Sequence, residues 1–321
     1  MAGPLQGAID SHRLTEVEQI KGGRTMLRSL YSGVSGMKSF QTRMDVIANN
    51  IANVNTVAYK SSRARFQDML SQTIAGGQGP MEGGRGGVNP QQVGLGVKLG
   101  SIDAMMENGA LQATNRDLDF AIEGEGFFTV ASRFTGVNGE EPMEPNFTRD
   151  GAFFVDSTGY LVNSNGQKVL GFLADDDGNL LMPAEPIGSG DLRALTIPET
   201  MNGEDLQVFG IDGSGNVSAV YGTNDPIVIG RFAVTTFSTP EGLEKLGSNN
   251  YTVSPNSGNP RIGVAGDPGV GVIRQGFLEM SNVDLANEFT EMVIASRAYT
   301  ANSRSITTSD EMLQDLINLK R

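Results

Sequence analysis

The chain contains no cysteine and no tryptophan, and its single histidine is His12. The absence of cysteine excludes disulfides and thiolate metal sites. Because the only histidine stands near the N-terminus, a Ser-His-Asp triad or a histidine metal cluster has no histidine in the body of the chain. No run of 18 apolar residues occurs, so the sequence predicts no membrane-spanning helix.

Motifs for phosphate, dinucleotide and calcium binding are also missing. Neither Gly-x-x-x-x-Gly-Lys-Ser/Thr nor Gly-x-Gly-x-x-Gly occurs. The run Asp175-Asp176-Asp177-Gly178-Asn179 begins like a calcium loop but lacks the later glycine and acidic ligand, so a β-turn is expected there. We therefore predict a non-enzymatic protein with no catalytic residue, no metal ligand and no cofactor.

Composition and charge favour a β-rich body between two different ends. The 321 residues include 42 glycines and only 7% aromatics, which suits many turns. Residues 71–280 hold 11 basic and 26 acidic residues, whereas residues 26–70 hold six basic and two acidic ones. An acidic body disfavours nucleic acid as a partner, because phosphate contacts need a basic face.

Both ends of the chain carry apolar residues at helical spacing. The N-terminal stripe has steps of three or four and comprises Leu27, Leu30, Val34, Met37, Phe40, Met44, Ile47, Ile51 and Val54. The C-terminal stripe has two interleaved columns seven residues apart, namely Leu285, Met292, Tyr299, Ile306 and Leu313, and Phe289, Ser296, Ser303, Asp310 and Ile317. This is the a/d repeat of a coiled coil.

Two interpretations of these stripes are open. In the first, an ordinary antiparallel helix pair lies in one globular core. In the second, the stripes stay unburied in a monomer and pack between copies of the chain. We adopt the second, which predicts a polymerisation interface at Leu27, Leu30, Val34, Met37, Met44, Ile47, Ile51, Val54, Leu285, Phe289, Met292, Tyr299, Ile306, Leu313 and Ile317.

The expected fold class is α+β, with terminal N- and C-helices forming a coiled-coil-like inner domain and a central, mostly antiparallel β domain. Residues 1–25 are expected to be a leader, disordered or not part of the native protein. Residues 26–70 and 281–321 form the inner helical domain, with the first helix ending near an asparagine cluster. Residues 71–102 read as a glycine-rich linker or extended segment, and residues 103–280 as the β domain.

Hairpin signals divide the β domain. Asp-Ser-Thr-Gly and Asn-Ser-Asn-Gly separate short apolar runs between residues 147 and 172. Further strands are predicted at 169–174, 206–211, 217–221, 227–237 and 250–253. One helical turn is predicted at residues 241–246.

Three stretches of the chain resemble the bacterial flagellar rod and hook proteins. They are MLRSLYSGVSGMKSFQTRMDVIANNIANVNTVAYKSS at residues 26–62, GALQATNRDLDFAIEGEGFFTV at 109–130, and GFLEMSNVDLANEFTEMVIASRAYTANSRSITTSDEMLQDLINLKR at 276–321. They occur in the order expected for the family. The third stretch is most similar to hook subunits, and residues 66–103 are similar to both distal rod subunits and the short, Gram-positive type of hook subunit.

The resemblance implies a structural subunit of the flagellar hook, a curved tubular universal joint between rod and filament. The alternative is a distal rod subunit, and the remote alternative is a secreted β-domain adhesin or enzyme with helical oligomerisation ends. It also implies the following partners: copies of itself, the distal rod protein, the hook cap, the hook–filament junction protein and the flagellar export apparatus. Export without a cleaved signal peptide, by the type III route, would place it in the extracellular hook and basal body.

Overall fold

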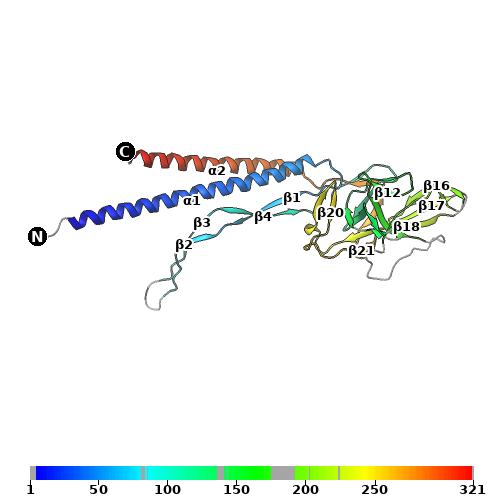
Figure 1. The fold of residues 1–321 in the computed structure, drawn as a ribbon, viewed down its shortest axis with the longest axis horizontal. Helices are drawn as coiled ribbons and strands as arrows, with labels where there is room; N and C mark the ends of the chain where they lie inside the picture. The colour runs from blue at the N-terminus through cyan, green and yellow to red at the C-terminus, as the bar shows by residue number, and fades with distance from the viewer. Residues whose placement is uncertain are drawn as a thin grey trace. The chain divides into compact units, whose positions relative to one another are not determined.

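The computed structural model describes residues 5–80, 84, 86–135, 141–142, 144–174, 192–201, 203–222 and 225–319. The chain divides into two compact units (Figure 1). Unit 1 comprises Met1–Ile51, Ser62–Asp103 and Leu285–Arg321, and unit 2 comprises Ala52–Ser61 and Ala104–Asp284. The structure is mostly β with an N-terminal and a C-terminal helix, which agrees in outline with the sequence-based prediction.

The two long helices both belong to unit 1. Helix α1 spans Leu5–Ala52 and helix α2 spans Leu285–Leu319. The α2 boundaries agree with the stripe, and α1 ends within the asparagine cluster. The start of α1 differs from the expectation of a leader without regular structure at residues 1–25. No proline occurs between Leu5 and Ala52, so nothing stops a helix from propagating towards the N-terminus once it has formed.

Asn50, in the last turn of α1, fixes where the chain goes next. Its side-chain Nδ2 donates to Ser62 O at 2.9 Å, and Ser62 N donates to Asn50 Oδ1 at 3.0 Å. The amide therefore acts as a short strand partner for the first residue of β1, Ser62–Asp68. This pairing explains why a buried asparagine is tolerated, since both of its polar atoms have partners.

Residues 71–102, predicted as a glycine-rich linker or extended segment, are largely extended and paired as strands. Strand β2, Ser71–Ala75, pairs antiparallel with β3, Gln91–Gly94, and an isolated bridge joins Gln78 to Val88. Strand β4, Val97–Ala104, pairs with β1. Glycine and proline are concentrated between the paired ends, where a turn needs them, so their density did not predict the flanking hairpin.

Unit 2 contains one large sheet and several short ladders. The main path runs β15-β16-β17-β18-β13-β7-β10-β20-β19, with every described pairing in it antiparallel. The ten-residue β18 is its junction, because Val234 pairs with both Phe128 and Gly263 while Arg231 pairs with Phe172 and Asn216.

The strands of unit 2 are β5 Leu111–Ala113, β6 Phe120–Glu123, β7 Phe127–Ala131, β8 Phe134–Thr135, β9 Glu141–Pro142, β10 Pro145–Thr148, β11 Phe153–Val155, β12 Leu161–Asn163, β13 Lys168–Leu173, β14 Arg193–Ala194, β15 Thr200–Met201, β16 Glu204–Ile211, β17 Asn216–Tyr221, β18 Ile227–Thr236, β19 Glu244–Gly247, β20 Asn250–Thr252, β21 Arg261–Val264, β22 Val272–Gln275 and β23 Phe277–Glu279.

The predicted turns are largely confirmed. Asp156 Oδ1 accepts hydrogen bonds from Thr158 and Tyr160 between β11 and β12, and Asn163 Oδ1 accepts from the amides of Asn165 and Gln167 before β13. The five strands predicted between residues 169 and 253 are present as β13, β16, β17, β18 and β20. The predicted turn at residues 175–179 lies outside the described residues.

The helical turn predicted at residues 241–246 is present, but it begins one residue earlier and ends at Gly242. A 3₁₀ turn, Pro240–Gly242, is followed by β19, which pairs with β20. Proline at the first position favours a single turn, and strand pairing with Asn250–Thr252 then decides the rest.

The core of unit 2 is built around four phenylalanines from separate strands. Phe128 contacts Phe153 with ring centroids 5.3 Å apart, and Phe232 lies 5.3 Å from Phe120. All four rings are fully buried. Each ring removes roughly 150–250 Å² from water, so this cluster is a principal source of stability in unit 2.

Candidate polymerisation surface

Helices α1 and α2 lie side by side and antiparallel within unit 1 (Figure 1). Small residues allow the close approach. A Cβ added at Gly33 would come within 3.0 Å of Ile306 Cγ1, and one at Gly36 within 2.8 Å of Asn302 Nδ2. Further along, the hydroxyls of Ser29 and Ser309 are 3.3 Å apart. The helices therefore pack through small and polar side chains rather than through a continuous apolar seam.

The other end of the helix pair is closed by charged and amide groups. Arg43 forms an ion pair with Glu291, and Asn50 Nδ2 donates to Glu288 Oε1 at 2.9 Å. The Arg43 and Glu291 side chains are 29% and 44% exposed, so the pair contributes about 1 kcal/mol or less. Its value lies in setting the register of the two helices.

The β1–β4 ladder of unit 1 also touches α1. Val97 N donates to Ser35 Oγ at 3.4 Å, and the rings of Phe40 and Phe66 meet edge to face at 5.6 Å. Gly96 has φ +113, and a Cβ there would lie 2.2 Å from Ser35 Oγ, so only glycine fits. This contact holds the ladder against α1 at one end.

The structure separates the two predicted columns of α2. Met292, Tyr299, Ile306 and Leu313 are half-buried in the monomer, so these residues are not left unburied as expected. Leu285, Phe289 and Ile317 are exposed, at 39%, 52% and 68%. Beside Ile306, a second column of α2 contacts α1: Glu288, Asn302 and Ser309 contact Asn50, Gly36 and Ser29, and Ala295, at the same seven-residue spacing, is fully buried. An apolar search misses it because its residues are small or polar.

The N-terminal stripe is likewise divided. Ile47 is buried, and Leu30, Met37, Met44 and Ile51 are half-buried, whereas Val34 is 38% exposed. Val54 lies beyond the end of α1, in unit 2, and is half-buried. The side chain of Leu27 lies outside the described residues. Part of the predicted surface is therefore an intramolecular contact.

A continuous apolar surface remains on the first third of α2. We call it the α2 apolar face, and it consists of Leu285, Phe289 and Val293. Val293 is 51% exposed and was not predicted. Ile294, 50% exposed, lies about 100° further round the helix and is not part of this face. Residues 285, 289 and 293 follow each other at a spacing of four, so they line one side of the helix. Large apolar side chains grouped and exposed in this way mark a surface that packs against another chain.

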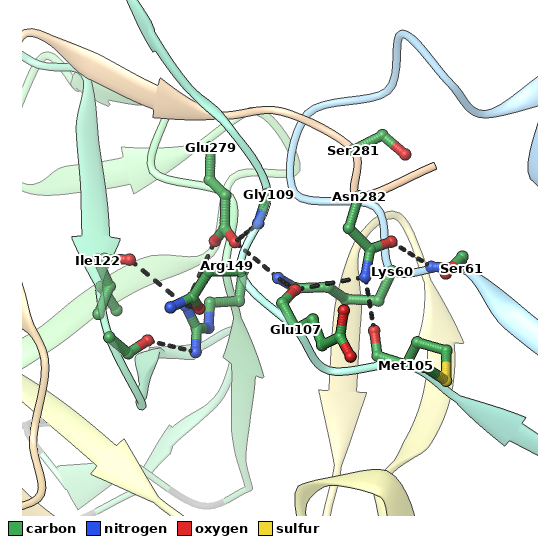
Figure 2. Close-up of polar contacts among 12 residues, drawn as sticks. Lys60, Ser61, Met105, Glu107, Gly109, Ile122, Arg149, Glu279, Ser281 and Asn282 are labelled. Carbon is green, nitrogen blue, oxygen red and sulfur yellow. Dashed lines mark hydrogen bonds and ion pairs between the residues drawn. The ribbon is translucent and has the colours of Figure 1, made fainter. Parts of the chain in front are cut away.

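In unit 2, a buried group of charges holds the ends of the β unit together (Figure 2). We call Lys60, Arg149 and Glu279 the charged cluster; their side chains are 1%, 4% and 0% exposed. Lys60 Nζ lies 2.6 Å from Glu279 Oε1, and Arg149 Nη1 lies 3.4 Å from Glu279 Oε2. Burial lowers the pKa of Lys60 and of Arg149, and the carboxylate of Glu279 opposes both shifts.

Asn282 extends these contacts to the neighbouring backbone. Its Oδ1 accepts from Ser61 N at 2.8 Å, and its Nδ2 donates to Met105 O at 2.8 Å. Lys60 Nζ donates to Glu107 O at 2.7 Å (Figure 2). Three chain segments far apart in sequence are thus joined at one place. Sequence reasoning missed this cluster because nothing in the pattern brings residues 60, 149 and 279 together.

The described residues contain no group of three His, Cys, Asp or Glu side chains placed to hold a metal ion. Over the same part of the chain, neither helix has the length and apolar content needed to cross a bilayer. A β unit attached to a helix pair with an exposed apolar face defines a structural protein that assembles with other chains.

Comparison with known families agrees with this class. Residues 30–60 match the flagella basal body rod protein model, residues 121–219 the flagellar hook protein FlgE/F/G D1 domain, and residues 274–319 the flagellar basal body rod FlgEFG protein C-terminal model. The first and third models match the two ends of the chain, and the second matches a large part of the β unit.

Curated relatives extend the similarity over nearly the whole chain. The flagellar basal-body rod protein FlgG of Bacillus subtilis is 46% identical over 297 residues, covering 92% of this chain and 100% of that protein. The flagellar hook protein FlgE of Borreliella burgdorferi is 30% identical over 453 residues, again with 92% and 100% coverage. The chain belongs to the flagellar rod and hook protein family, whose members are structural subunits of the flagellum.

Among solved structures, the Helicobacter pylori flagellar hook protein FlgE2 matches at 17% identity and a TM-score of 0.22. The match covers 60% of this chain and 47% of that one. This similarity is too low to carry an argument about the fold.

Proposed function

We propose that this chain is a subunit of the flagellar distal rod, which polymerises with copies of itself into a straight tube. The observation that supports this most directly is the agreement in length and identity with rod proteins. The Bacillus subtilis rod protein aligns over 297 residues at 46%, and the Borreliella burgdorferi one over 300 residues at 38%.

A hook subunit, which the C-terminal stretch suggests, is the second candidate. Hook proteins of Borreliella burgdorferi and Treponema pallidum are 30% identical to this chain, over alignments of 453 and 473 residues. Both alignments are longer than the 321 residues available here, so the hook relatives contain inserted segments without a counterpart. A subunit lacking such segments has less material for the outer contacts of a bending tube.

The α2 apolar face supports polymerisation as the mechanism. Burying these side chains against a neighbouring subunit contributes roughly 25 cal/mol per Å² of apolar surface. In this proposal the close contacts between α1 and α2 hold the monomer's helix pair together, and the α2 apolar face joins subunits. The helices of adjacent subunits then form a coiled-coil-like inner layer, with the β units outside.

The β2–β3 hairpin favours a stiff polymer over a flexible one. Leu70, Ile74 and Val88, in and around the hairpin, are 82%, 63% and 52% exposed. In an isolated subunit these exposed apolar side chains contribute no burial energy to stability. In a polymer they would add apolar contacts between subunits, beside those of the helices. A paired hairpin that contacts neighbours resists bending more than the loose linker that its composition predicts.

Membership of the rod and hook family suggests further partners for this chain. A rod subunit contacts its own copies first and is delivered by the flagellar export apparatus. The hook cap and the hook–filament junction protein are partners of the hook alternative. The proposed location in either case is the flagellar basal body and hook.

Electron microscopy of polymers grown from the purified protein tests the proposal. A rod subunit should form straight tubes, and a hook subunit should form tubes that curve or supercoil. If neither form appears under conditions that polymerise a known rod protein, self-assembly into a tube is not the function of this chain.

A further inference from the structure

The positive and negative charges of the charged cluster in unit 2 do not cancel. The cluster contains two cations, Lys60 and Arg149, and a single carboxylate, Glu279, which is completely buried and contacts both. Glu125 attracts Arg149 but forms no direct bond with it in the described structure. Two buried like charges repel each other, and each loses its hydration, so Glu279 is the group that makes their joint burial possible.

The remaining partners of the two cations are neutral. Lys60 Nζ donates to the backbone oxygen of Glu107. Arg149 Nη2 donates to Gly124 O at 2.9 Å and Nη1 to Asn108 Oδ1 at 3.1 Å. Such acceptors satisfy hydrogen bonds but leave the net charge unchanged. Removing the carboxylate would therefore leave Lys60 and Arg149 buried together without the counter-ion that contacts both of them.

The three charges come from distant parts of the chain. Lys60 belongs to the segment Ala52–Ser61, which enters unit 2 from the N-terminal side. Arg149 directly follows β10, and Glu279 is the last residue of β23, the final strand. The only anion of the cluster is thus contributed by the end of the β unit that is synthesised last.

Glu279 also holds the N-terminal segment through its backbone. Ala58 N donates to Glu279 O at 2.7 Å, and Gly109 N donates to Glu279 Oε1 at 2.8 Å. Three residues further on, Asn282 accepts from Ser61 N. Both the main chain and the side chains around residues 279–282 are therefore needed to seat residues 58–61.

We propose that Glu279 is the lock that fixes the segment Ala52–Ser61 on the β unit, so that this segment becomes ordered only after β23 is in place. The rest of the β unit packs around the phenylalanine core, whose side chains are apolar and come from residues other than Lys60, Arg149 and Glu279. A chain whose C-terminal part has not yet joined the sheet keeps its N-terminal connection undocked. The lock lies within one subunit and would act in the same way in a rod or a hook.

Hydrogen exchange followed by mass spectrometry on the full chain tests the lock. The variants are Glu279→Gln, Lys60→Met and the double variant Lys60→Met/Glu279→Gln. Glu123→Gln is the matched control, because it removes the carboxylate of the exposed Arg274–Glu123 pair. Peptides covering residues 52–61 report on the lock, and peptides from β7 and β18 report on the core.

Glu279→Gln should speed exchange at residues 52–61 by at least about tenfold, whereas β7, β18 and the control keep wild-type protection. The double variant should be better protected at residues 52–61 than Glu279→Gln alone, since it removes one of the two unmatched cations. If Glu279→Gln fails to fold, the double variant is measured in its place; it should fold, with faster exchange than wild type at residues 52–61 and wild-type protection in β7 and β18.

Two results would overturn the proposal. The first is wild-type protection of residues 52–61 in Glu279→Gln. The second is a double variant no better protected, or no better folded, than the single one, which would mean that the carboxylate acts by shape and not by charge.

Discussion

Gly33 of α1 lies directly against Ile306 of α2, so close that a Cβ on Gly33 would come within 3.0 Å of Ile306 Cγ1. The association of the chain's two ends therefore depends on the absence of a side chain at one position. It also means that Ile306, a member of the predicted C-terminal stripe, already has a partner within the subunit.

Replacing Gly33 with valine should open the helix pair. Overpacking typically destabilises by 1–3 kcal/mol, and the small and polar residues at this contact offer little apolar burial to offset that loss. We expect tube formation by electron microscopy to fall sharply while unit 2 melts within about 1 °C of wild type. Gly210→Val in β16 of unit 2 is the control, because no heavy atom lies within 4 Å of a Cβ there. Equal loss of tubes in both variants would contradict a specific role for Gly33.

Phe289 tests the α2 apolar face without disturbing the monomer. It is 52% exposed, so Phe289→Asp should change the free energy of unfolding by less than about 0.5 kcal/mol. In a polymer the same aspartate would be buried without a partner, and we expect tubes to disappear. Thr300→Asp, on an exposed polar part of α2, should leave assembly largely intact. Normal tubes from Phe289→Asp would remove the α2 apolar face from the interface.

Replacing Ala58 with glycine should make unit 2 more stable. Ala58 is buried and has φ +57, a left-handed conformation that costs an L-residue roughly 1–2 kcal/mol. Because glycine also loses more chain entropy on folding, we expect Ala58→Gly to stabilise unit 2 by up to about 1 kcal/mol. Calorimetry should show a rise in Tm of a few degrees. Ala48→Gly inside α1 should act in the opposite sense and weaken the helix.

Ionisation of the buried Tyr251 should make the protein less stable at alkaline pH. Burial, with further contributions from Tyr59 and Glu279, raises its pKa from 10 to about 12. A raised pKa means that the folded state holds the phenolic proton more tightly, so stability is complete below pH 10 and decreases between pH 10 and about 12. The loss amounts to about 3 kcal/mol at most.

Denaturant titrations at pH 9 and pH 11 measure this effect, with Tyr251→Phe as the comparison. The phenylalanine variant cannot ionise, so its stability should fall less between the two pH values. An identical decrease in both proteins would assign the alkaline loss to other groups.

Two features of the chain could be predicted from periodicity. A spacing of three and four residues identifies the helices, as at Leu285, Phe289 and Met292. Alternation between turn signals such as Asp-Ser-Thr-Gly identifies the strands on either side. Both depend on neighbours within a few residues, which is why the boundaries of α2, β13 and β17 are close to the expected ones. The hairpin at β2–β3 was missed because strand pairing can occur on either side of a glycine-rich stretch.

The sequence by itself determined the family, the elements and the presence of an apolar stripe at each end. Only the tertiary structure decided which side of each helix faces inwards, because small residues such as Gly33 and Ala295 set the closest approach and carry no hydrophobic signal. The charged cluster was likewise invisible before folding. Lys60, Arg149 and Glu279 are separated by 89 and 130 positions, and a buried charge becomes recognisable only once the fold shows what removes it from water.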